Sequence, residues 1–152
     1  MDARLNYSAS PTAGKVLKPV MAAGRAVKDS SLPPATQELV ALRVSQINGC
    51  AVCLDMHTKE AAAAGETAVR LNLVAAWREA TVFTDAERAA LELAEAVTVQ
   101  TDAQSAPSDE VWANASKHYT DVQLGALVMH ISLVNFWNRV NVATHQDDAV
   151  WR

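Results

Sequence analysis

The sequence predicts an all-α fold, a single-domain bundle of about six to seven helices spanning residues 1–152. The chain contains 29 alanines against 5 glycines and 5 prolines, and only 5% of its residues are aromatic, which favours helices over strands. No alternation of apolar and polar residues longer than four positions indicates a strand. Half of the residues are hydrophobic and 20% are charged, so the chain can form a core and intrinsic disorder is excluded.

The first two helices are expected in the N-terminal third. Apolar residues recur with helical spacing over 12–28, and Pro19 lies inside this pattern, so the helix either begins near it or bends there. A proline pair suits the first turn of a second helix at 34–47. The dipeptide Asn48-Gly49 is typical of a helix C-terminus and ends it.

The remaining helices are expected to follow one another through short loops. Their expected ranges are 50–65, 67–79, 84–99, 107 onward and 120–143, with a polar loop at 101–105. The helix at 84–99 begins with a capping box formed by Thr84 and Glu87, and the last helix begins with the equivalent pair Thr120 and Gln123.

Charge and hydropathy exclude several classes of partner. The formal net charge of −4 argues against nucleic acid or an anionic membrane as a partner. No apolar run approaches the roughly 18–20 residues of a membrane span. The first residues lack the basic and then apolar pattern of a secretory signal, so we expect a cytoplasmic location.

The segment that carries chemistry is Cys50-Ala51-Val52-Cys53 followed by His57. If a helix begins just after Gly49, its unpaired backbone N–H groups and positive dipole end favour a thiolate at Cys50. Cys53 and His57 follow at successive helical turns on the same face. Two thiols at this spacing can cycle between dithiol and disulfide.

A Cys-x-x-Cys pair has other interpretations. Two buried structural cysteines are one of them. A zinc site of Cys50, Cys53 and His57 with an acid is another, although structural zinc sites usually take ligands from two separated segments and the chain has no second such pair. A thioredoxin-like motif would follow a strand in a βαβ pattern, which is absent. A redox dithiol in a helical frame is therefore favoured.

The segment from Glu38 to Glu60 resembles the core motif of the alkylhydroperoxidase D family, within the carboxymuconolactone decarboxylase-like superfamily. An acid lies twelve residues before the Cys-x-x-Cys pair and a histidine four residues after it. The motif core covers about 38–65, and the resemblance extends over about 5–145, with further similarity in 75–79 and 135–139.

The resemblance implies roles for four residues. Cys53 matches the cysteine that attacks peroxide and Cys50 the resolving cysteine, which is the better placed to meet the reductant. His57 and Glu38 match a proton relay. The physical argument agrees in part, because the helix N-terminus favours Cys50 whereas the i+4 histidine favours Cys53.

The resemblance also implies an activity and partners. It implies an antioxidant enzyme that reduces a hydroperoxide and is regenerated by an external dithiol, either lipoyl-type or thioredoxin-like. No cofactor and no metal are implied, and family members assemble as trimers or hexamers, so a homo-oligomer is expected. Some members carry a further histidine between the cysteines, where this chain has Val52.

Three other functions remain open at this point. The pair could serve a thiol–disulfide oxidoreductase or redox sensor without peroxidase turnover, a zinc-bound structural or interaction protein, or a decarboxylase or lactone enzyme on the same fold. Outside the motif, we expect His130 to be buried and hydrogen-bonded, and Trp77 and Trp137 to be core or subunit-contact anchors before pocket walls. Asn135, Asn138, Arg139 and Asn141 form a polar stretch within an otherwise apolar helix.

Overall fold

A computed structural model of the chain describes residues 3–6, 9–100 and 106–146. Within these ranges the fold is all-α, with seven α-helices and no strand, as the composition predicts. The helices are α1 (Pro11–Lys28), α2 (Pro34–Asn48), α3 (Ala51–Ala63), α4 (Ala68–Leu73), α5 (Asp85–Thr98), α6 (Asp109–Ser116) and α7 (Asp121–Thr144), with a 3₁₀ turn η2 (Val74–Ala76) after α4. The loop expected at 101–105 lies outside the described residues.

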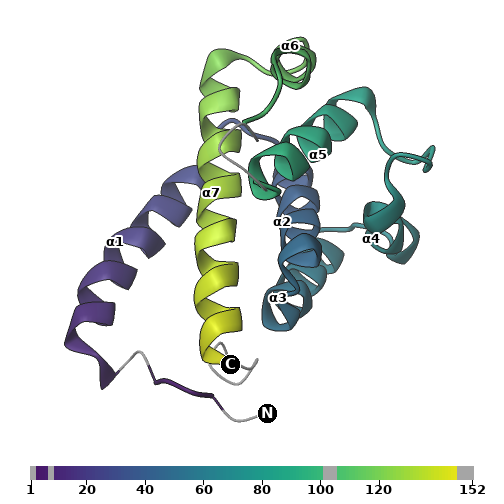
Figure 1. The fold of residues 1–152 in the computed structure, drawn as a ribbon. Helices are drawn as coiled ribbons and strands as arrows, with labels where there is room; N and C mark the ends of the chain where they lie inside the picture. Colours follow the sequence, from purple (N-terminus) through teal and green to yellow (C-terminus); the bar gives the residue numbers. More distant parts are fainter. Residues whose placement is uncertain (1–2, 7–8, 101–105, 147–152) are drawn as a thin grey trace.

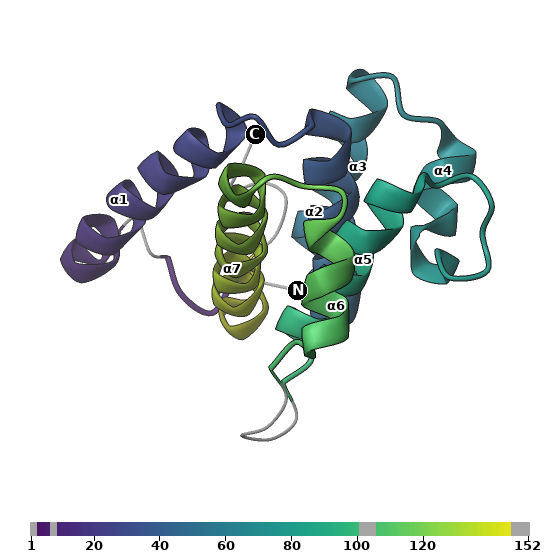
Figure 2. The ribbon, with the colours of Figure 1, turned by 90° about the horizontal axis from the view of Figure 1, so that it is seen from above.

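The long helix α7 separates α1 from the rest of the bundle (Figures 1 and 2). In both views α1 lies on one side of α7, and α2, α3 and α5 lie on the other. Helix α2 packs against α3, α5 and α7, whereas α1 packs mainly against α7. Only Val27 of α1 is buried, so α1 is the least covered of the long helices.

The core forms around α2, which has apolar side chains on several faces. The larger cluster joins α2, α5 and α7, and includes Val40, Val44, Leu93, Leu127 and Ile131. A second cluster joins α2 and α5 to the segment after α4, and includes Leu39, Leu42, Val74, Trp77 and Leu91. Because α2 is held by both clusters, the side chains at its C-terminal end have a fixed position.

Two helices differ from the expectation. Helix α1 begins at Pro11, with Ser10 as its N-cap, and continues through Pro19. The helix expected at 67–79 instead ends at Leu73 and tightens into η2. In a 3₁₀ turn residues three apart lie on one side, which brings Val74 and Trp77 together into the second cluster. Both capping boxes are confirmed.

A tight turn joins α2 to α3. Gly49 has φ of 68°, in the left-handed region that glycine adopts without strain. The N–H of Cys50 donates to the Ser45 carbonyl at 3.0 Å, which closes the end of α2. Cys50 is then the N-cap of α3, so the second helix ends and the cysteine motif begins within two residues.

No helix among the described residues is long and apolar enough to cross a lipid bilayer.

Candidate active site

Cys50 and Cys53 form a disulfide, with their Cα atoms 5.3 Å apart. Both are buried, at 1% and 3% exposure. Cys50 is the N-cap of α3 rather than a residue of its first turn, and Cys53 is the third residue of that turn. The start of α3 therefore supplies backbone N–H groups near both sulfurs, and its dipole favours negative charge at this position. In the disulfide neither sulfur is a thiolate able to bind a metal.

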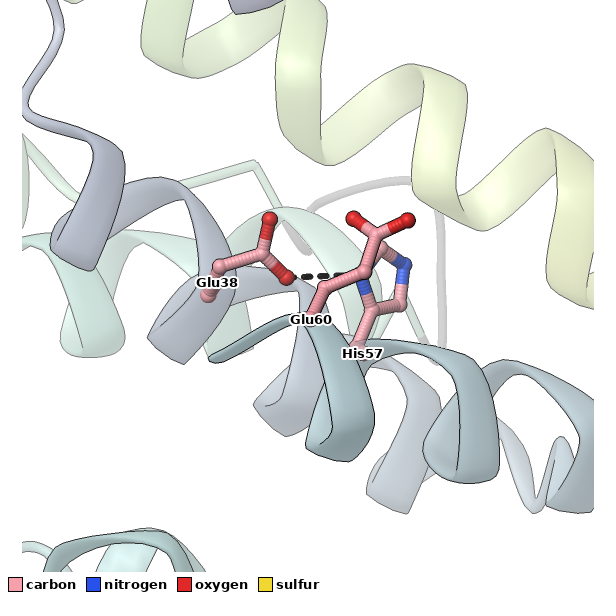
Figure 3. A group of neighbouring side chains, drawn as sticks. All are labelled: Glu38, His57 and Glu60. Atoms are coloured by element: carbon pink, nitrogen blue, oxygen red, sulfur yellow. Dashed lines mark hydrogen bonds and ion pairs between the residues drawn. The ribbon is translucent and has the colours of Figure 1, made fainter. Parts of the chain in front are cut away.

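His57 and Glu38 form the second part of the site. His57 lies one turn after Cys53 on α3, and its Nδ1 is 2.9 Å from Oε2 of Glu38 on α2 (Figure 3). A carboxylate oxygen can only accept, so Nδ1 carries a proton in this hydrogen bond and Nε2 is the ring nitrogen left for another partner. The two side chains are 14% and 16% exposed. Glu38 thus fixes the orientation of an imidazole one helical turn from the cysteine.

Helix α7 contributes a donor to the sulfur. The side-chain amide of the buried Asn141 donates to Sγ of Cys53 at 3.4 Å. A donor at this distance stabilises negative charge on sulfur more than it stabilises the neutral thiol. This contact joins residues 88 positions apart in the sequence.

The other asparagines of the polar stretch on α7 hold the end of α2. Asn138, which is fully buried, donates to the hydroxyl of Ser45 at 3.1 Å. The side chain of Asn48 donates to Asn135 at 2.9 Å and to Asn138 at 3.0 Å. Arg139 donates to Asn135 at 2.8 Å. These bonds fix the turn from which the cysteine motif starts, and they explain why an apolar helix carries polar residues three positions apart.

A cavity of about 300 Å³ opens beside this group. Cys53, His57 and Glu38 all line it, whereas Cys50 does not. The wall is otherwise mostly apolar and is formed by Val52, Met56, Leu133, Val134 and Trp137 together with one face of α1. Cys53 is therefore the sulfur that a molecule in the cavity would meet.

His130 lines the same cavity from α7. Its Nε2 is 2.8 Å from the carbonyl oxygen of Gln37, so Nε2 is the protonated nitrogen. The predicted hydrogen bond is confirmed, but the residue is half-buried rather than buried. Desolvation lowers the pKa of His130 below its ordinary value of 6.5, against the hydrogen bond to Gln37, which favours the charged ring. A neutral imidazole with a fixed tautomer thus faces the group formed by His57 and Glu38.

A group of three metal-ligand side chains occurs among the described residues: Glu38, His57 and Glu60, with ligand atoms within 4.8 Å of one another (Figure 3). Lys28 already lies 3.5 Å from the exposed Glu60 carboxylate. The Glu60 carboxylate is paired with a lysine ammonium, and the other two residues are joined by a hydrogen bond.

The structure therefore brings together all four residues singled out from the sequence. Sequence reasoning missed the contact between Asn141 and Cys53, although the i, i+3, i+6 spacing of Asn135, Asn138 and Asn141 could have indicated one polar face of α7. Trp77 is a core residue, as expected. Trp137 instead lines the cavity.

Residues 14–96 match the model of the carboxymuconolactone decarboxylase family. The chain belongs to this family. The matched range includes both cysteines, His57 and Glu38, and covers more than half of the chain.

Individual relatives are similar to the chain over nearly its full length. The uncharacterized protein YdfG of Bacillus subtilis (strain 168) is 38% identical over 143 residues, which is 94% of this chain and 95% of YdfG. A protein of unknown function from Agrobacterium tumefaciens, described as a candidate antioxidant defence protein AhpD, has a crystal structure that superposes with a TM-score of 0.88 at 36% identity. That match covers 96% of this chain and 97% of the other. An uncharacterized peroxidase-related protein from Silicibacter sp. TM1040 shares the fold, with a TM-score of 0.75 at 21% identity over 86% of this chain and 69% of the other.

Proposed function

We propose that this protein is a thiol-dependent peroxidase of the alkylhydroperoxidase type, acting in antioxidant defence. The observation that carries the proposal is the position of Cys53 in one cavity with the hydrogen-bonded pair of His57 and Glu38. A reactive thiol needs a neighbouring base and an oriented proton path, and both are present here. The resemblance to the Agrobacterium protein described as AhpD supports the same activity.

The first half of the proposed reaction takes place at Cys53. In the reduced protein, Nε2 of His57 accepts the thiol proton, and the thiolate attacks an oxygen of the hydroperoxide. The S–O bond forms as the O–O bond breaks. The leaving alkoxide takes the proton back from His57 and departs as the alcohol, so Cys53 is left as a sulfenic acid.

The second half closes the disulfide. The thiol of Cys50 attacks Sγ of Cys53, the S–S bond forms, the S–O bond breaks, and hydroxide leaves as water with the proton of Cys50. The two thiols have then supplied the two electrons that reduced the peroxide. An external dithiol, lipoyl-type or thioredoxin-like, reopens the bond by thiol–disulfide exchange.

The decisive experiment measures peroxide consumption with a dithiol donor. Cys53→Ser and Cys50→Ser are each expected to reduce turnover to background. His57→Gln is expected to slow it by about a hundredfold or more, because general acid–base catalysis contributes factors of this size. His118→Gln, on an exposed histidine at the end of α6, is the matched control and should leave turnover unchanged.

Several outcomes would contradict the proposal. Full activity of either cysteine variant would exclude the two-cysteine cycle. Fast disulfide exchange without peroxide turnover would indicate a thiol–disulfide oxidoreductase or sensor, and about one zinc per chain in protein purified without chelator would indicate a metal-binding role. Turnover of a carboxylated lactone that survives cysteine alkylation would indicate the lactone chemistry.

We also propose that the protein acts as a homo-oligomer, a trimer or hexamer. The exposed apolar side chains Val16 and Met21 on α1 and Met129 on α7 support this, at 46%, 47% and 56% exposure. Light scattering coupled to size-exclusion chromatography measures the mass directly, and a monomer at micromolar concentration would contradict it.

A further inference from the structure

The cavity wall formed by α1 has a different chemistry from the rest of the site. Met21, Gly24, Arg25 and Lys28 line the cavity from α1, at positions i, i+3, i+4 and i+7. These positions form one face of a helix, so a continuous stripe of α1 faces Cys53 across the cavity. This stripe combines a methionine and a glycine with two cations.

Almost every charged side chain along the cavity has a partner. Lys28 pairs with Glu60 at 3.5 Å, and the carboxylate of Glu38 is hydrogen-bonded to His57. Desolvation lowers the pKa of His130, which favours its uncharged form. Arg25 is the remaining cation along the cavity, and in the part of the chain that the structure describes its guanidinium has no hydrogen bond or ion pair.

The apolar wall and the unpaired cation select one class of ligand. An alkyl chain would be buried against Met56, Leu133 and Trp137, and each methylene removed from water there favours binding. A guanidinium beside such a wall favours a carboxylate, for which its fork of donors is suited. A cation in the last turn of α1 is also favourable for the helix dipole, but that role does not require it to line a cavity.

We propose that the cavity binds medium-chain amphipathic carboxylates, with the alkyl chain against the apolar wall and the carboxylate at Arg25. This inference rests on the proposed function in one respect, namely that the cavity is where the chemistry occurs. The substrate class is then a hydroperoxide of an organic acid rather than hydrogen peroxide or a neutral alkyl hydroperoxide.

Because Gly24 has no side chain, the cavity is wider on the side that α1 lines. A Cβ at this position would meet no atom within 4 Å, so the space in front of the helix is open there. A leucine at Gly24 would occupy that space without changing the charge. The two contributions to binding, apolar contact and charge, can therefore be removed separately.

Binding is best measured on the oxidised protein, because no turnover is then required. Calorimetric titration with octanoate and with 1-octanol compares a charged and a neutral ligand of the same chain length. Arg25→Gln is expected to weaken octanoate binding about three- to fivefold, the range for a partly exposed ion pair, and to leave octanol binding unchanged. Lys18→Gln removes a charge from α1 outside this cavity and is the matched control, with no expected change. Gly24→Leu is expected to weaken both ligands.

Three results would overturn the inference: no octanoate binding to the unaltered protein, equal octanoate binding by Arg25→Gln, or an equal loss in Lys18→Gln, which would indicate a general charge effect.

A kinetic experiment uses a hydroperoxyoctanoic acid, with its carboxyl group free, and the methyl ester of the same compound. Arg25→Gln should raise KM for the acid alone and leave kcat unchanged. If neither hydroperoxide is reduced, the proposed function fails, while the binding result with octanoate stands by itself.

Discussion

Glu95 on α5 and Glu38 on α2 have the same burial and opposite surroundings. Each side chain is 16% exposed. Glu95 accepts from Arg43 at 2.6 Å, from Trp77 at 2.9 Å and from Arg78. Glu38 has one hydrogen-bond partner among the described residues, His57, and faces a cavity. Burial alone therefore does not distinguish these two acids, whereas the number and type of their partners does.

The surroundings of Glu95 also set its charge state. Desolvation raises the pKa of Glu95, but the hydrogen bonds from Trp77, Arg78 and Arg43 outweigh it and hold that pKa below its usual value of 4.5. Three hydrogen-bond donors stabilise the ionised form of this carboxylate, so its protonation is disfavoured. The pair of Glu38 and His57 keeps one ring nitrogen open toward the cavity, which is what proton transfer requires.

The largest expected effect is a loss of peroxide turnover when Glu38, rather than Glu95, is replaced. Glu38→Gln is expected to reduce peroxide turnover by about a hundredfold or more, because the amide removes the negative charge beside His57 and can also donate to Nδ1, so it no longer fixes the ring tautomer. The free energy of unfolding, measured in urea, should change by less than about 1 kcal/mol. Glu38→Gln with unaltered turnover would remove the basis of the comparison.

The second expected effect is a loss of stability, with little change in turnover, when Glu95 is replaced. Glu95→Gln is expected to lower the free energy of unfolding by about 1–3 kcal/mol, since two guanidinium groups lose their charged acceptor. Peroxide turnover by the folded protein should stay within about twofold of the unaltered chain. A lower free energy of unfolding reduces the folded fraction but does not change the geometry of the site in the molecules that remain folded. A large loss of turnover at full folding would mean that Glu95 supports the site as well.

The same variant has a predicted pH dependence. Because the folded-state pKa of Glu95 lies below its value of 4.5 in the unfolded chain, its ionised form stabilises the fold above pH 4.5. That stabilisation is lost as the pH falls through the folded-state pKa. The difference in unfolding free energy between Glu95→Gln and the unaltered protein should therefore shrink below pH 4.5, and a constant difference would contradict the assignment.

A fourth prediction tests whether the sulfur itself has a donor. In the reduced protein, Asn141→Ala is expected to slow alkylation of Cys53 by iodoacetamide at neutral pH by about fivefold, because a hydrogen bond to charged sulfur contributes about 1 kcal/mol or more. Asn114→Ala is the matched control, since Asn114 donates instead to Glu92 at 3.0 Å and neither residue lines the cavity. Equal rates in all three proteins would show that the amide does not stabilise the thiolate.

The smallest effect concerns the turn before the motif. Gly49→Ala is expected to lower the free energy of unfolding by about 1 kcal/mol, through backbone strain at φ of 68° rather than a clash, because a Cβ there meets no atom within 4 Å. Gly14→Ala, inside α1 and equally free of contacts, should have the opposite sign. If both variants changed the free energy of unfolding in the same direction, the left-handed conformation at Gly49 would not be the cause of the effect.

Local signals explain what could be predicted from the sequence. Capping boxes at Thr84 and Thr120, and the stop at Gly49, act within four residues, so their positions follow from short-range chemistry. The relation of Cys53 to His57 depends only on helical periodicity and was equally accessible.

Contacts between helices could not be predicted in this way. Glu38 was identified only through a family resemblance, because the residues next to it in the sequence do not indicate which face of α2 packs against α3. The contact from Asn141 and the position of Arg25 depend on how α7 and α1 pack on the rest of the bundle. The early end of α4 depends on the burial of Trp77, which is decided by the core and not by helix propensity.

The arrangement of α1 has a consequence for how this protein can diversify. The sulfurs, the imidazole and the carboxylate come from α2 and α3, which the core holds, and Asn141 comes from the middle helix α7. The helix that completes the cavity is instead a largely exposed neighbour with one buried side chain. Replacements along Met21, Gly24 and Arg25 can therefore change which molecules are accepted at little cost to folding. On the proposed function, recognition and redox chemistry can therefore evolve separately in this chain, and exchanging α1 between relatives tests whether ligand preference moves with that helix.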